Sequence, residues 1–257
     1  MTWLEHGYEL IDGGRPPSDP WSYIAELVGQ RPEMVEVQPI RPVEHGRSFA
    51  STRGFTPLHT DSQDYRGAAP RLQVMICRQA AARGGETILL DTRPLVAHLA
   101  KADPALHRAL FTVTRTHRFY FGDLVGPTIA TRRGHQVFTH APQPPIDPVG
   151  EALAAHLASA PLIGVPVATG QVLLVDNHRM LHGRTAFADG TRHFVRLLAW
   201  FTATPTVEDH RLAVVCELLA GTPPAKLAAR ERISEAELYA WRTQALSAAL
   251  GALRPSS

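Results

Sequence analysis

Short apolar segments with the length of β-strands recur through the middle of the chain and most constrain its fold. Arg71–Cys77 is apolar at alternate positions, and Glu86–Asp91 follows a Gly84-Gly85 turn. Alternation of this kind places one set of side chains on each face of a strand. Further strand-like segments are Leu110–Arg115, Gln136–Thr139, Gly164–Val167, Gly170–Val175 and Arg192–Phe201. Many short strands around a pocket predict a mainly β fold with added helices and a double-stranded β-helix (jelly-roll) core.

Helical patterns flank and interrupt these strands. Ser234-Glu-Ala-Glu237 matches a capping box at the start of the last helical pattern. The region from about 206 to 253 is expected to form amphipathic helices that cover the core. Without a linker or an internal repeat, residues 1–257 are expected to form a single domain. The predicted helices are Pro20–Val28, Arg93–Leu110 with a break near Pro104, Val149–Ser159, Asp209–Leu219 and Ser234–Leu253.

Composition narrows the class of protein. The 257 residues are 44% hydrophobic and 19% charged, which is typical of a globular protein. A net charge of +2 without a basic block disfavours nucleic acid as a partner. No signal-peptide pattern and no run near the roughly 18 apolar residues of a membrane span are present, so we expect a cytoplasmic protein that does not bind membranes. Cys77 and Cys216 are expected to be core residues.

His59 and Asp61 form a candidate metal motif with His182. Two residues that lie two positions apart on an extended strand project from the same face, so His59 and Asp61 can reach one metal. His182 follows an apolar, strand-like run and offers a third ligand. Two histidines and one carboxylate with open positions opposite suit non-haem Fe(II). An isolated H-x-D is common by chance, so the motif alone leaves other divalent metals open.

Arginines at alternate positions follow the third ligand. If the segment around residues 192–196 is a strand, Arg192 and Arg196 point to one face with Phe194 between them. A buried arginine needs an anion, and its planar guanidinium binds a carboxylate through two hydrogen bonds. In the alternative arrangement both arginines face solvent, while the inward side chains are those of Val195, Leu197 and Ala199.

Three separated motifs together resemble those of the TauD/TfdA-like Fe(II)/2-oxoglutarate-dependent dioxygenases of the clavaminate-synthase-like superfamily. They are Leu58-His-Thr-Asp61, Arg83-Gly-Gly-Glu-Thr-Ile-Leu-Leu-Asp91, and Asp176-Asn-His-Arg-Met-Leu-His-Gly-Arg184 with the two arginines that follow it. The resemblance runs in the same order over residues 55–202. Three motifs in register are far more specific than any one of them.

The resemblance implies a role for each of several residues. His59, Asp61 and His182 would be the iron ligands. Arg192 would bind the distal carboxylate of 2-oxoglutarate, and the Thr87 hydroxyl would bind the same carboxylate. The position of Arg196 resembles one that meets an anionic group of the substrate in some members.

Other interpretations rest on the residues alone. Arg184 would line the site, orient a residue that binds the metal, or lie on an exposed loop. Residues 63–66 would form a substrate lid or an ordinary surface loop.

The reaction that follows from this resemblance uses Fe(II), 2-oxoglutarate and O2. Succinate and CO2 would be released while a C–H bond of a small polar, amino-acid-like metabolite is hydroxylated. Halogenating relatives have a small residue at the position of Asp61, so halogenation is disfavoured. Desaturation, cyclisation and epoxidation use the same metal ligands and are alternative outcomes of the reaction. The chain is also a candidate for self-association into a homo-oligomer.

Two alternatives belong to other classes. A cupin-like sensor would bind metal and 2-oxoglutarate without consuming oxygen. A zinc hydrolase would need a metal-bound water and a nearby general base. The chain has no H-E-x-x-H motif, and a hydrolase does not explain Arg192 or Thr87.

Overall fold

Two antiparallel sheets form the centre of the computed structural model, which describes residues 2–46, 48–62, 68–132, 135–201 and 207–252. The predicted mainly β fold with a jelly-roll core is confirmed. The larger sheet has the order β1 (Tyr8–Ile11), β11 (Val172–Asp176), β4 (Leu72–Gln79), β13 (His193–Trp200) and β2 (Met34–Ile40). The smaller sheet has the order β10 (Ile163–Val165), β5 (Thr87–Asp91), β12 (Met180–Arg184) and β3 (Thr56–His59).

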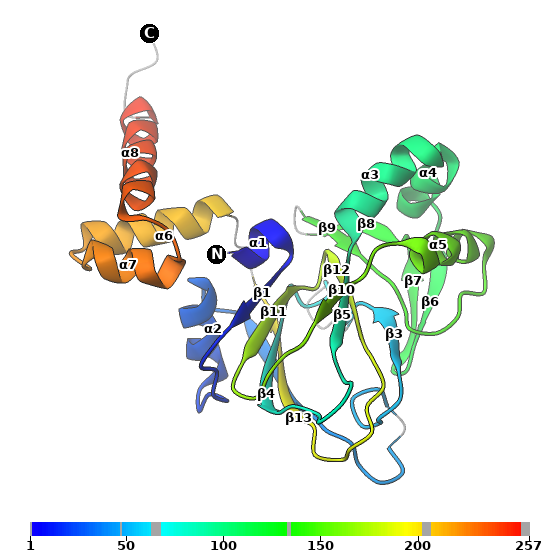
Figure 1. Cartoon of the computed structure of the whole chain (residues 1–257). Helices are drawn as coiled ribbons and strands as arrows, with labels where there is room; N and C mark the ends of the chain where they lie inside the picture. Colours follow the sequence, from blue (N-terminus) through cyan, green and yellow to red (C-terminus); the bar gives the residue numbers. More distant parts are fainter. Residues whose placement is uncertain (1, 47, 63–67, 133–134, 202–206, 253–257) are drawn as a thin grey trace.

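The two sheets face each other (Figure 1). Side chains from both sheets form one apolar cluster in the space between them. Leu89 and Met180 come from the smaller sheet, whereas Leu173, Val175 and Phe194 come from the larger one. Because side chains alternate between the faces of a strand, residues next to these in sequence point outward. Both outer faces are covered by helices, which explains why β4, β5 and β11 are apolar along most of their length.

Helices α1 (Thr2–His6) and α2 (Pro20–Val28) cover the larger sheet. Ile24 and Val28 of α2 pack there on Leu197 and other outward residues of the sheet. On the smaller sheet lie α3 (Thr92–Ala102), α4 (Pro104–Thr112) and α5 (Pro148–Ser159). Their apolar cluster includes Leu99 and Leu153, both fully buried. Each of these last three helices begins after an aspartate whose side chain accepts a backbone N–H of the first turn: Asp91, Asp103 and Asp147.

The predicted strand Leu110–Arg115 is wrong. Leu110 to Thr112 form the last turn of α4, and Leu110 is buried in the cluster of the smaller sheet. A short apolar run has no clear period, so the packing of Leu110 onto the neighbouring helices decides its conformation. The strand that follows, β6 (Arg115–Phe119), pairs with β7 (Gly122–Gly126). A second hairpin joins β8 (Ile129–Arg132) and β9 (His135–Phe138).

The C-terminal helices α6 (Val207–Leu219), α7 (Pro224–Glu231) and α8 (Glu235–Ala252) lie to one side of the sheets (Figure 1). They form an apolar cluster of their own around Val214, Leu227 and Leu238, so the expectation that they cover the core is wrong. Cys77 is buried as expected, but Cys216 is exposed on α6. Among the described residues, no helix has both the length and the apolar character needed to cross a bilayer.

The apolar cluster between the smaller sheet and helices α3, α4 and α5 predicts how strongly Leu153 stabilises the fold. Leu153→Ala should lower the free energy of unfolding by about 2–5 kcal/mol, because the fully buried Leu153 leaves a cavity among α3, α4 and α5. Leu162→Ala is the matched control, since Leu162 is 52% exposed and its loss should change stability by less than about 0.5 kcal/mol. Urea denaturation measures both changes, and equal effects would contradict the packing described above.

Candidate metal and cosubstrate site

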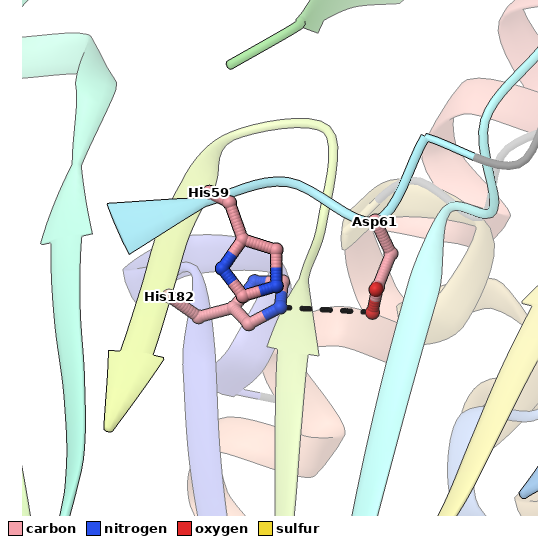
Figure 2. Close-up of side chains that lie close together, drawn as sticks. All are labelled: His59, Asp61 and His182. Atoms are coloured by element: carbon pink, nitrogen blue, oxygen red, sulfur yellow. Dashed lines mark ion pairs between the residues drawn. The ribbon is translucent and has the colours of Figure 1, made fainter. Parts of the chain in front are cut away.

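The three predicted metal ligands meet at one end of the space between the sheets (Figure 2). His59 is the last residue of β3, and His182 lies opposite it on β12 in the strand register. Asp61 follows β3 by two residues. One ligand atom from each side chain lies within 4.8 Å of the others, and His182 Nε2 is 3.6 Å from Asp61 Oδ2. The structure therefore brings the predicted set together.

Burial sets the protonation of these ligands. Burial lowers the pKa of His182 to about 3, with a further contribution from neighbouring His59. Burial also lowers the pKa of His59, whose Nδ1 lies 2.9 Å from the Pro57 carbonyl oxygen. A hydrogen bond donated from Nδ1 leaves Nε2 with a free lone pair. Neutral imidazoles are the form that a metal requires.

Two side chains hold the carboxylate of Asp61, one on each oxygen. Arg196 donates to Oδ1 at 2.7 Å, and Gln73 donates to Oδ2 at 2.6 Å. Burial opposes ionisation of Asp61, but the charge of Arg196 and the adjacent histidines give it a lowered pKa. Arg196 also donates to Gln38, so its guanidinium already has two partners, Asp61 and Gln38. The role of Arg196 in binding a substrate anion stays a prediction.

Asn177 connects the two segments that carry the ligands, and sequence reasoning does not find it. Its side chain is fully buried in the turn between β11 and β12. Asn177 Oδ1 accepts the backbone N–H of Asp61 at 2.8 Å, and Asn177 Nδ2 donates to the Asp61 and Pro70 carbonyls at 2.7 and 2.8 Å. One amide therefore fixes the backbone of Asp61 relative to the hairpin that bears His182.

Gln73 is a second residue that sequence reasoning misses. It is 2% exposed on β4, and its Nε2 lies 3.0 Å from His182 Nε2 as well as beside Asp61. The Gln73 amide can donate to His182 only if His182 Nε2 carries a lone pair and no proton. The same lone pair on Nε2 is the one that a metal would bind. No sequence signal separates this glutamine from any other strand residue.

Arg192 and Thr87 line the same cavity as His59 and His182. The Arg192 side chain is 2% exposed, and its guanidinium lies 4.0 Å from the centre of the Phe194 ring. Burial lowers the pKa of Arg192 to about 10, with nearby Arg184 adding to the effect. Among the ion pairs of the described residues none involves Arg192, so a buried guanidinium faces the cavity without a carboxylate.

The position of β13, which begins at His193, shows whether Arg192 and Arg196 face the space between the sheets or the solvent. Phe194 and Arg196 point into the space between the sheets, and the opposite face of β13 packs on α2. The alternative in which both arginines face solvent is therefore wrong, because the sheet is covered on both faces. Alternation alone could not exclude it, since helices on the outer face bury Val195, Leu197 and Ala199 as well.

Arg184 is buried on β12 and is not an exposed loop residue. Its guanidinium donates to the carbonyls of Phe49, Thr52 and Gly54 at 3.3, 3.0 and 2.7 Å. Arg184 therefore holds the segment 49–54 over the cavity. Its role in binding substrate stays a prediction, and residues 63–66, expected as a lid or surface loop, lie outside the described residues.

Comparisons with known proteins identify the family of the chain. The family described as "Taurine catabolism dioxygenase TauD, TfdA family" matches residues 23–167 and 147–198, which is more than half of the chain. The chain belongs to the TauD/TfdA family. A comparison with curated protein sequences gave no match.

Solved structures of TauD-like oxygenases share the fold. An asparagine oxygenase with Fe(II), 2S,3S-3-hydroxyasparagine and succinate is 18% identical, with a TM-score of 0.52 over 65% of this chain and 57% of that one. PvcB from Pseudomonas aeruginosa is 20% identical, with a TM-score of 0.55 and 77% coverage of each chain. OrfP with Fe and α-ketoglutaric acid is 18% identical, with a TM-score of 0.55 over 77% of this chain and 75% of that one. The chain thus spans little more than half of the asparagine oxygenase.

The position of Asn177 predicts a loss of metal affinity when its amide is removed. Asn177→Ala should weaken Co(II) binding by about 10- to 100-fold, because residues that orient metal ligands contribute at this level. Titration with Co(II), followed by its visible absorption, measures the affinity. Leu227→Ala is the control, since Leu227 is buried in the separate apolar cluster of the C-terminal helices, which contains no neighbour of a metal ligand. An unchanged affinity in Asn177→Ala would show that the amide only stabilises the turn.

Proposed function

We propose that the chain is an Fe(II)- and 2-oxoglutarate-dependent oxygenase that hydroxylates a C–H bond of a small polar, amino-acid-like metabolite and releases succinate and CO2. One observation carries this proposal. The buried, unpaired guanidinium of Arg192 shares a cavity with a set of two imidazoles and one carboxylate. A metal site alone suits many reactions, but a metal site with a cation at its far end suits a dicarboxylate that binds at both ends.

Different residues would bind the two ends of 2-oxoglutarate. His59, Asp61 and His182 would hold Fe(II), since neutral imidazole and ionised carboxylate are the donors that this metal prefers. Arg192 would bind the distal carboxylate through two hydrogen bonds, and the Thr87 hydroxyl would donate to the same group. When bound, iron, O2 and 2-oxoglutarate would supply the oxidising chemistry, in which the keto acid loses CO2 and becomes succinate.

The surroundings of the site support its selectivity for this cosubstrate. Phe187 lies 5.5 Å from the Arg192 guanidinium, and the Phe194 ring lies closer still. These rings exclude water from the cation, so a carboxylate that reaches it forms a stronger ion pair than it would in water. Arg196 and Gln73 keep Asp61 ionised and fixed in position.

The substrate class rests on similarity and on the ligand set. The solved structures named above include oxygenases described with 3-hydroxyasparagine and with (3S)-hydroxy-L-Arg. An amino-acid-like substrate for this chain is therefore part of the proposal, with Arg196 and Arg184 as its predicted contacts. Asp61 favours hydroxylation over halogenation, while desaturation, cyclisation and epoxidation would use the same residues. The cytoplasmic location also stays a prediction.

Two substitutions test this assignment. With Fe(II), the wild-type protein should convert 2-oxoglutarate to succinate, slowly alone and faster with its substrate. Arg192→Met should bind Co(II) as the wild type does but bind 2-oxoglutarate at least about 30-fold more weakly, because the distal carboxylate loses its buried partner. His182→Ala should lose metal binding instead.

Calorimetric titration of each variant with Co(II), and then with 2-oxoglutarate, separates these outcomes. Equal binding of 2-oxoglutarate by wild type and Arg192→Met would contradict the proposal. A sensor would bind 2-oxoglutarate tightly but form no succinate with any substrate pool. The activity of a zinc hydrolase would not depend on 2-oxoglutarate.

A further inference from the structure

The wall of the cavity beside His59 is aromatic and continues to the surface. The Phe49 ring centre lies 6.1 Å from that of His59, and it also lies 4.8 Å from the Tyr120 ring in an edge-on arrangement. Tyr120 sits in the turn of the β6–β7 hairpin and is 51% exposed. Two aromatic rings therefore connect a predicted metal ligand with solvent. A half-exposed tyrosine packed on a cavity residue is a surface on which a small molecule can bury apolar atoms.

The charged groups of the cavity are unsuited to a cationic side chain. Of the described residues that line it, none is aspartate or glutamate apart from the nearby ligand Asp61, which Arg196 already neutralises. Arg184 and Arg192 both line the cavity and carry positive charge. A cationic side chain brought into this space would lose its hydration and meet the arginines.

The arginines also have uses other than contact with a substrate side chain. Arg184 is held by backbone carbonyls of residues 49–54, and Arg196 by Asp61 and Gln38. Arg192 is the group that the proposed function assigns to 2-oxoglutarate. The remaining lining side chains include several apolar ones: Ile40, Phe49, Ala50 and Met75.

We propose that the substrate is an amino-acid-like compound whose side chain is uncharged and apolar, and that this side chain packs against Phe49 and Tyr120. This inference rests on the proposed function and narrows its substrate class. It separates this chain from relatives whose structures contain hydroxyasparagine or hydroxyarginine, since those side chains are polar or charged. The two rings would hold the apolar side chain next to His59, and so next to the metal position.

Norleucine and lysine give a matched pair for the test, because both side chains have four carbons and only lysine carries an ammonium group. Each is titrated calorimetrically into the anaerobic protein loaded with Fe(II) and 2-oxoglutarate, and phenylalanine and arginine form a second pair. Norleucine should bind at least about ten-fold more tightly than lysine, as a buried charge without a partner is strongly disfavoured. Phenylalanine should likewise bind more tightly than arginine.

Equal or tighter binding of lysine or arginine would overturn the inference, as would the absence of binding by both apolar compounds. The same experiment separates this failure from a failure of the proposed function. If the metal-loaded protein does not bind 2-oxoglutarate, the proposed function is wrong. If 2-oxoglutarate binds but the preference is reversed, only the substrate class is wrong.

Substitutions of Phe49 connect the preference to the aromatic wall. Phe49→Ala should reduce the preference for norleucine over lysine by about ten-fold, whereas Phe49→Leu, which keeps an apolar surface, should retain most of it. Leu219→Ala is the control, because Leu219 is 58% exposed on α6 and should leave the preference unchanged. The same preference in Phe49→Ala and wild type would show that Phe49 does not contact the side chain.

Discussion

A buried carboxylate governs the organisation of this site. Asp61 is 5% exposed, and an ionised carboxylate at such a position is stable only when other groups compensate its charge and occupy its lone pairs. Arg196 and Gln73 provide this from the larger sheet, while Asn177 fixes the backbone of the same residue. The arrangement holds a negative charge beside two neighbouring neutral imidazoles (Figure 2). A divalent cation is the group that best completes it.

The two ends of the cavity carry groups of opposite character: metal-binding donors at one end and a cation at the other. At the metal end, ligand atoms of His59, Asp61 and His182 converge within 4.8 Å and can hold a cation. At the other end, Arg192 is a cation that lacks an anion among the described residues. A molecule with a metal-binding group at one end and a carboxylate at the other satisfies both requirements at once. The aromatic rings of Phe49 and Tyr120 lie beside His59 and offer an apolar surface next to the metal end.

Sequence patterns predicted those parts of the structure that depend on near neighbours. His59 and Asp61 were identifiable because two metal donors lie two residues apart, and helix α2 because Pro20–Val28 has a local helical pattern. The function of Asn177 was not identifiable, since its partner Asp61 lies 116 residues away. Likewise, the contact of Gln73 with His182 spans 109 residues. Pairing across sheets decides such contacts, and no local pattern records it.

The site can be tested most directly by a comparison of 2-oxoglutarate with 2-oxopentanoate, which has a methyl group in place of the distal carboxylate. Binding of both to the anaerobic, Fe(II)-loaded protein would be measured by calorimetry. If Arg192 binds the distal carboxylate, 2-oxopentanoate should bind at least about 30-fold more weakly, the loss expected when a buried charge loses its partner. Similar affinities for the two keto acids would contradict the assignment of Arg192 and of the cavity as a 2-oxoglutarate site.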